Sequence, residues 1–220
     1  MKIVQQQSGL SRRKSRDLIE EGEVNVDEKT ETNPFADYTL EDIDRIYLRG
    51  HPLSTYPPKK QAYKFYKPTG MLCSHDDPHY GRTLGRTLRS EGFIGYRWAG
   101  RLDQDAEGLL LLSNDGQLVH ALTHPRYEVE KVYEAVVTAQ FSEAHASQIV
   151  EGIELEDGAM GRAKKVEILE ENNAATTIRL ILAEGRKREV KQLCAAVGHP
   201  VRSLRRVVFA TLSDPDLGLG

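Results

Sequence analysis

The densest apolar run in this chain is Leu109–Leu112, four consecutive leucines bounded by a glycine and a serine. A membrane-spanning helix needs roughly 20 apolar residues, so this run is far too short to cross a bilayer. A short apolar run between turn residues is typical of a buried strand. Similar strand-like segments occur at Tyr63–Tyr66, Val132–Thr138 and Thr176–Leu182. Strand-like segments outnumber helical ones and hairpin-length connections dominate, which favours an α+β fold with a mixed, mostly antiparallel sheet over a doubly wound parallel sheet.

The composition is that of a folded protein, since 39% of the 220 residues are hydrophobic and 29% are charged. These proportions exclude wholesale disorder and suit one domain, or a small domain joined to a larger one. Cys73 and Cys194 form neither a disulfide framework nor a CxxC metal motif. The N-terminal stretch lacks the apolar segment of a signal peptide. We therefore expect a cytoplasmic protein with reduced thiols and no membrane association.

The formal net charge is only −3, yet the cations are concentrated in two places. The first is Arg12, Arg13, Lys14 and Arg16; the second is residues 184–206, where seven Lys or Arg minus two Glu give a charge of +5. Two basic clusters on a nearly neutral body suit a nucleic acid bound at defined places. Charge runs are also common on solvated helix faces, so charge alone leaves that alternative open.

The first 22 residues are predicted to be helical, because Ser11 can cap a helix that Gly22 ends. An alternating strand follows and leads into a predicted hairpin turn at Asp27 and Glu28. Residues 51–60 are short of apolar side chains and rich in proline, which predicts a linker. The chain is therefore expected to divide into domains 1–57 and 58–220. Further helices are predicted over 115–122, 142–152 and 186–197, and further strands over 163–169 and 207–212.

Residues 100–116 combine an acidic loop with the start of the leucine run. Asp103 and Asp105 in such a loop most often serve as turn or capping residues. Alternatively, a cation within about 4–6 Å would keep one carboxylate ionised and ready to act as a nucleophile. Arg101 and the distant Arg188 are candidate cations. Spacing alone does not decide between these roles.

The segment GRLDQDAEGLLLLSNDG at 100–116 closely resembles the catalytic signature of the RsuA-type ribosomal RNA pseudouridine synthases. Three more segments resemble other motifs of that family in the same order: KPTG at 67–70, HPRYEVEKVY at 124–133 and EGRKREVKQL at 184–193. Four ordered motifs are far more specific than any one of them. Residues 9–30, GLSRRKSRDLIEEGEVNVDEKT, resemble the S4 RNA-binding domain, with Asp27-Glu28 where an Asn-Gly turn is usual.

The resemblance implies a small S4-like RNA-binding domain followed by a catalytic domain that isomerises uridine. The N1–C1′ bond breaks, the base rotates and C5 bonds to C1′, so no cofactor and no metal are implied. Asp103 is then the essential carboxylate, Tyr133 lies against the flipped base, Arg188 pairs with Asp103, Leu193 lies in the substrate pocket and Lys67 supports the site. The residues expected to contact RNA are Arg12, Arg13, Lys14, Arg16, Arg101, Arg186, Lys187 and Lys191.

Two branches of the family remain open. Residues 153–158 and the Arg188-Glu189-Val190 form of the last motif resemble the large-subunit branch, which acts on 23S rRNA. The run from Cys73 to Pro78 resembles the small-subunit branch, which acts on 16S rRNA. A non-catalytic S4-type RNA-binding protein is a further alternative, against which the intact GRLD motif argues. We expect a monomeric partner of 23S rRNA, either free or within a ribosome assembly intermediate.

Overall fold

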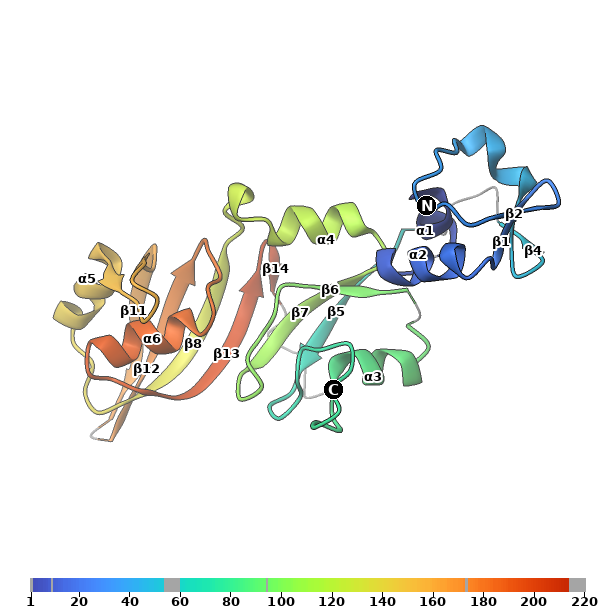
Figure 1. The fold of residues 1–220 in the computed structure, drawn as a ribbon. Helices are drawn as coiled ribbons and strands as arrows, with labels where there is room; N and C mark the ends of the chain where they lie inside the picture. The colour runs from blue at the N-terminus through green and yellow to red at the C-terminus, as the bar shows by residue number, and fades with distance from the viewer. Residues whose placement is uncertain (1, 9, 54–59, 94, 173, 214–220) are drawn as a thin grey trace. The chain divides into compact units, whose positions relative to one another are not determined.

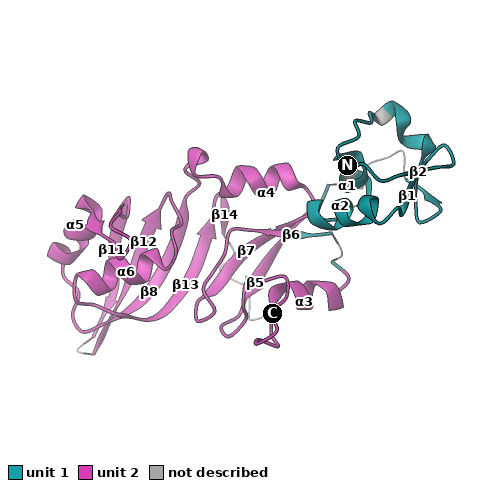
Figure 2. Cartoon of the chain, viewed as in Figure 1, with its two compact units in different colours: residues 1–61, 93–96 teal, residues 62–92, 97–220 magenta. Residues whose placement is uncertain are grey.

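A computed structural model gives the fold and describes residues 2–8, 10–53, 60–93, 95–172 and 174–213 (Figure 1). The chain forms two compact units, coloured separately in Figure 2: residues 1–61 with 93–96, and residues 62–92 with 97–220. The domain boundary predicted at residues 57 and 58 lies in the segment 54–59, outside the described residues. Within the described ranges, no helix is long and apolar enough to span a membrane.

The first unit combines short helices with a small antiparallel sheet around one apolar core. Side chains from both parts meet in that core, among them Ile3, Ile19, Val24 and Ile46. The helices are α1 (Lys2–Ser8), α2 (Arg12–Glu20) and the 3-10 helix η1 (Leu40–Arg45). The strands, in sheet order, are β2 (Lys29–Glu31), β1 (Val24–Val26), β3 (Ile46–Leu48) and β4 (His51–Pro52).

Local sequence signals explain how this unit begins. The Ser11 hydroxyl accepts a hydrogen bond from the backbone N–H of Lys14 at 3.2 Å, which caps α2 as predicted. Gly22, just beyond the helix, has φ 77°, a left-handed conformation that glycine adopts at little cost. Asp27 and Glu28 also have positive φ, at 47° and 69°, as a two-residue turn between twisted strands requires. The predicted hairpin is confirmed.

The second unit is built on a mixed sheet. Its main path runs β11-β12-β8-β13-β7-β5, with β14 paired to β13 and β6 paired to β7. The β13–β7 pair is parallel and the other pairs are antiparallel, which confirms the predicted mixed, mostly antiparallel sheet. The strands are β5 (Ala62–Lys67), β6 (Arg97–Ala99), β7 (Glu107–Ser113), β8 (Lys131–Thr138), β11 (Lys165–Glu171), β12 (Ala175–Leu182), β13 (Val201–Phe209) and β14 (Leu212–Ser213), with a separate pair β9 (Ile153–Glu154) and β10 (Met160–Gly161).

The helices of this unit are α3 (Leu84–Ser90), α4 (Gly116–Thr123), α5 (Glu143–Glu151), α6 (Glu189–Ala196) and the 3-10 helix η2 (Pro125–Tyr127). The Asp115 carboxylate caps α4 by accepting from the Gln117 N–H at 2.9 Å, as expected. The sequence did not predict α3 or β6. The helix predicted over 186–197 starts only at Glu189, because Arg188 has φ 54° and therefore cannot continue a right-handed helix.

Gly108 shows why the central strands can approach one another. It lies in β7 with φ 115°, opposite Arg206 of the parallel strand β13. A Cβ built at Gly108 would lie 2.4 Å from the carbonyl oxygen of Arg206, closer than any real side chain tolerates. Glycine therefore permits the contact that brings the end of the acidic loop next to β13.

Candidate active site

Asp103 lies in the loop that joins β6 to β7, at residues 100–106. Its side chain is half-buried, whereas the neighbouring Leu102 and Ala106 side chains are buried in the core. The Ala106 N–H donates to the Asp103 carbonyl oxygen at 3.1 Å, which closes a tight turn. The two buried anchors and this hydrogen bond fix the backbone on both sides of the Asp103 carboxylate.

Lys67, at the end of β5, is hydrogen-bonded to the backbone of the same loop. Its side chain is fully buried, and Nζ donates to the carbonyl oxygens of Ala106 at 2.6 Å, Pro68 at 2.9 Å and Gln104 at 3.4 Å. Burial lowers the pKa of Lys67. The Gly70 N–H also donates to the Gln104 carbonyl oxygen, at 2.7 Å. The structure thus brings Lys67 to the site that the sequence expected it to support.

A cavity of about 490 Å³ opens beside this loop, and we call it the Asp103 cavity. Asp103, Tyr133 and Arg188 all line it, although they come from three segments far apart in the sequence. The structure therefore brings together the three residues that the sequence selected as catalytic candidates. The full lining is Leu72, Cys73, Gly100, Arg101, Leu102, Asp103, Gln104, Ala106, Tyr133, Leu182, Glu184, Gly185, Arg186, Lys187, Arg188, Glu189, Val190 and Leu204.

Tyr133 is placed by the sheet. It lies on β8, with Leu180 of β12 on one side and Arg206 of β13 on the other. Only 8% of its surface is exposed, so its position is fixed by packing on both flanking strands. A rigid aromatic side chain in a cavity wall offers a surface on which a base can stack.

The expected pairing of Arg188 with Asp103 is not formed in this structure. No ion pair within 4.0 Å joins these two described residues, and the Arg188 side chain is exposed. Lys191, which was expected to contact RNA, instead forms an ion pair with Asp105 in the same loop. This contact, more than the weaker influence of Arg188, lowers the pKa of the Asp105 carboxyl. Lys191, about one helical turn beyond the predicted partner, therefore pairs with a carboxylate of the acidic loop.

Leu193 was expected to lie in the substrate pocket. It lies in the middle of α6, is completely buried, and is not among the residues that line the Asp103 cavity. Its spacing within the helix already allowed a plain core position. The structure places Leu193 in the core and not in the lining of the Asp103 cavity.

The remaining predicted RNA contacts are exposed. Arg101, Arg186 and Lys187 line the Asp103 cavity, and Arg186 pairs with Glu184 at 3.1 Å. In the other unit, α2 carries the exposed cations Arg12, Arg13, Lys14 and Arg16. Arg16 also pairs with Glu20 at 2.7 Å, so part of its charge is already balanced within the protein.

Two residues of the cavity were missed by the sequence analysis. Glu189 is 3% exposed, its Oε2 accepts from the Arg186 N–H at 3.0 Å, and its Oε1 has no partner among the described residues. Burial raises the pKa of Glu189 to about 7. Cys73 lies under the loop, with Sγ 3.5 Å from the Leu102 nitrogen, and burial raises the pKa of its thiol. The available signal for Glu189 was an acid placed among the cations of residues 186–191.

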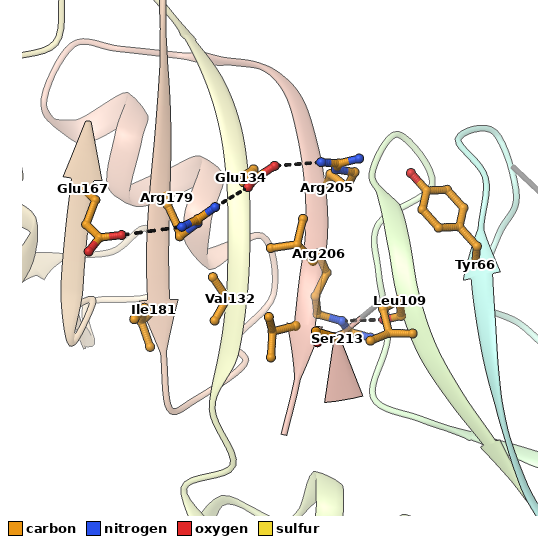
Figure 3. A pocket seen from close by; sticks show the side chains of 12 residues that line it. Tyr66, Leu109, Val132, Glu134, Glu167, Arg179, Ile181, Arg205, Arg206 and Ser213 are labelled. Carbon is orange, nitrogen blue, oxygen red and sulfur yellow. Dashed lines mark hydrogen bonds and ion pairs between the residues drawn. The ribbon is translucent and has the colours of Figure 1, made fainter. Parts of the chain in front are cut away.

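A separate cavity of about 500 Å³ involves neither Asp103 nor Tyr133 nor Arg188 (Figure 3). There Glu134 accepts from Arg179 and Arg205, each at 2.8 Å, above an apolar floor that includes Val132. Glu134 and Glu167 are paired with arginines of this cavity, and its lining holds no residue of the acidic loop. Asp103, Tyr133 and Arg188 therefore meet in the Asp103 cavity and not in this one.

The comparisons with known proteins agree with this geometry. The family model described as RNA pseudouridylate synthase matches residues 62–196. The chain is 33% identical over 224 residues to ribosomal large subunit pseudouridine synthase B of Bacillus subtilis, covering 100% of this chain and 88% of that protein. It is 36% identical over 208 residues to an RNA pseudouridine synthase of Aquifex aeolicus, covering 92% and 82%.

A comparison with solved structures gives the same family. A pseudouridylate synthase crystal structure superposes with a TM-score of 0.65 at 30% identity and covers 96% of this chain and 88% of that chain. The mixed sheet, the anchored Asp103 loop and these relatives all lead to one assignment. The chain belongs to the RNA pseudouridine synthase family and is an isomerase.

Proposed function

We propose that this protein converts one uridine of 23S ribosomal RNA to pseudouridine, with the Asp103 carboxylate as the catalytic group. The observation that carries the proposal is the Asp103 cavity, because it joins Asp103, Tyr133 and Arg188 in one space. The choice of the large ribosomal subunit is supported by the name of the relative from Bacillus subtilis, which is similar over the whole of this chain.

The target nucleotide must leave its stack before it can reach Asp103. Flipping a base out costs a few kcal/mol, which contacts in the pocket have to offset. The cavity of about 490 Å³ lies within the range of roughly 300–1,000 Å³ typical of small-molecule sites. Tyr133 offers an aromatic surface for the base, and the cations at the rim offer contacts for the RNA backbone.

The reaction then exchanges one glycosidic bond for another. The N1–C1′ bond breaks while the Asp103 carboxylate opposes the positive charge that develops on the sugar, as carboxylates do in glycoside cleavage. The detached base rotates, and C5 forms the new bond to C1′. The hydrogen on C5 leaves as a proton and N1 gains one, so the product is an isomer of the substrate. Nothing is oxidised or reduced, and the step calls for no redox cofactor.

The first unit has the features of an RNA-binding module. Its helix α2 presents Arg12, Arg13 and Lys14 to solvent, and the hairpin that follows matches the S4-like sequence pattern. Cations on a helix contact phosphates and fix the orientation of an RNA without reading its sequence. We propose that this unit supplies affinity for rRNA while the Asp103 cavity selects the target uridine.

Mapping pseudouridine in the rRNA of a deletion strain tests the proposal. One 23S site is expected to disappear and to return when the wild-type gene, but not an Asp103→Asn gene, is restored. Loss of a 16S site instead would refute the assignment to the large subunit. An unchanged map of both rRNAs would refute rRNA as the substrate. Purified protein with naked transcripts or with assembly intermediates then identifies the form that is modified.

A further inference from the structure

A second, smaller cavity adjoins the Asp103 cavity, and nothing in the proposed reaction uses it. It has a volume of about 150 Å³, and we call it the side cavity. The two cavities share six residues in their linings: Gly100, Arg101, Tyr133, Glu184, Gly185 and Arg186. A group bound in the side cavity is therefore an immediate neighbour of a nucleoside bound beside Asp103.

Arg206 is a buried cation that lines both the side cavity and the cavity of Figure 3. It is only 1% exposed, its Nε donates to the Leu109 carbonyl oxygen at 2.8 Å, and its guanidinium lies 4.6 Å above the Phe209 ring. Its Nη2 is buried and has no hydrogen-bond partner among the described residues. A buried guanidinium N–H without an acceptor is costly, so the Arg206 charge, which no carboxylate among the described residues balances, favours an anion nearby.

Lys131 is the second cation there. Its Nζ donates to the carbonyl oxygens of Val129 at 2.8 Å and Glu184 at 3.4 Å, which holds it against the cavity wall. Burial lowers the pKa of Lys131, and the charge of Arg206 lowers it further. Two like charges held this close in a half-buried site repel one another unless an anion lies between them.

The charges that line the side cavity are unbalanced. Arg101, Lys131, Arg186 and Arg206 contribute four cations, and Glu184 is the lining carboxylate among the described residues. Glu184 is already paired with Arg186 at 3.1 Å. Glu189 also acts on Lys131 electrostatically, but it is not part of this lining. The lining thus carries three more cations than anions, and neither Lys131 nor Arg206 forms an ion pair with a carboxylate of the described residues.

We propose that the side cavity binds a backbone phosphate of the RNA substrate, the phosphodiester next to the flipped nucleotide. The inference rests on the proposed function, since it needs an RNA strand at the Asp103 cavity. At about 150 Å³ the side cavity is well below the roughly 300–1,000 Å³ of small-molecule sites. The planar fork of an arginine suits phosphate oxygens, and the wall shared with the Asp103 cavity brings the nucleotide and its phosphate together.

A neutral-phosphate scan tests this subsite. Each phosphodiester around the target uridine of a synthetic rRNA stem-loop is replaced singly by an uncharged methylphosphonate, and the Kd for wild-type protein is measured. One position next to the target is expected to weaken binding by about tenfold or more, the effect of losing a charge-assisted contact. This sensitivity should vanish in Arg206→Gln or Lys131→Gln.

Arg205→Gln is the matched control. Arg205 precedes Arg206 on β13 and pairs with Glu134, as Figure 3 shows. It is not among the residues that line the side cavity. This variant should keep the wild-type sensitivity. Equal sensitivity in all variants, or none at a neighbouring phosphate in wild type, would overturn the subsite. If Arg206→Gln and Lys131→Gln fail to fold, the wild-type scan still decides. An RNA that binds with the expected sensitivity but is not isomerised would count against the proposed function alone.

Discussion

The Lys67 ammonium lies 2.6 Å from the carbonyl oxygen of Ala106, so a buried charge at the end of β5 holds the loop that carries Asp103. Replacing it by methionine in Lys67→Met keeps the length of the side chain but leaves three carbonyl oxygens without this donor. We expect unfolding free energy to fall by about 1–3 kcal/mol and kcat to fall with it. Urea unfolding and single-turnover kinetics measure the two effects.

Lys64→Met on the same strand is the control for that variant. Lys64 is exposed, and its Nζ donates to the Ser213 carbonyl oxygen at 2.9 Å. An exposed substitution of this kind usually changes stability by no more than about 0.5 kcal/mol. Equal losses in Lys67→Met and Lys64→Met would show that Lys67 does not hold the loop.

Glu189 gives the molecule a predictable dependence on pH. Burial raises its pKa to about 7, so the folded protein retains a proton that the unfolded chain releases near pH 4.3. This contribution to stability is complete below the unfolded pKa and is lost as the pH rises through about 7. Glu189→Gln should remove that loss, so its stability relative to wild type should increase between pH 5 and pH 8 by about 1–3 kcal/mol.

Glu143→Gln is the control for Glu189→Gln, because Glu143 is also the first residue of a helix but is exposed. Guanidinium unfolding of the three proteins at both pH values makes the comparison. Parallel behaviour of wild type and Glu189→Gln would mean that Glu189 is ionised in the folded protein at pH 5.

Asp103→Asn should abolish isomerisation while RNA binding persists. Asparagine has nearly the same shape but cannot carry the negative charge that the proposed step requires. Asp105→Asn is the informative partner, because it removes the ion pair with Lys191 without touching Asp103. It should lower turnover less than Asp103→Asn does. Turnover is followed by release of tritium from C5 of labelled RNA, and near-wild-type activity in Asp103→Asn would remove Asp103 from the mechanism.

Much of this arrangement could be predicted from local sequence. The leucine run became β7, Ser11 and Asp115 cap their helices, and the motifs correctly grouped Asp103 with Tyr133. The strand and the two helix caps depend on residues that are close together in the sequence. The grouping of Asp103 with Tyr133 depends on sequence motifs. Arg188 does not pair with Asp103, and its left-handed backbone makes α6 begin one residue later, at Glu189. Lys191 of that helix pairs with Asp105 of the acidic loop instead. Such distances follow from packing between distant segments, which no local pattern encodes.

Gly108 should tolerate no side chain. Gly108→Ala would place a Cβ 2.4 Å from the Arg206 carbonyl oxygen at φ 115°, so β7 and β13 must separate. We expect a loss of more than about 3 kcal/mol, or failure to fold. Gly92→Ala is the control, since Gly92 has φ 79° but nothing within 4 Å of the added Cβ. It should cost only about 1 kcal/mol from backbone strain, and a similar cost for both variants in urea unfolding would contradict the proposed close contact.

Charge reversal on α2 tests the first unit. Arg12→Glu with Arg13→Glu should weaken rRNA binding and flatten its dependence on salt, because each phosphate contact releases about 0.7–0.9 counterion. Loss of two contacts lowers the slope of log K against log salt by about 1.4–1.8. Arg49→Glu is the control, since Arg49 lies elsewhere on the same unit and already interacts with Glu23 at 3.4 Å. An unchanged slope in the double variant would mean that Arg12 and Arg13 are solvated surface residues, and the RNA-binding role of α2 would have to be abandoned.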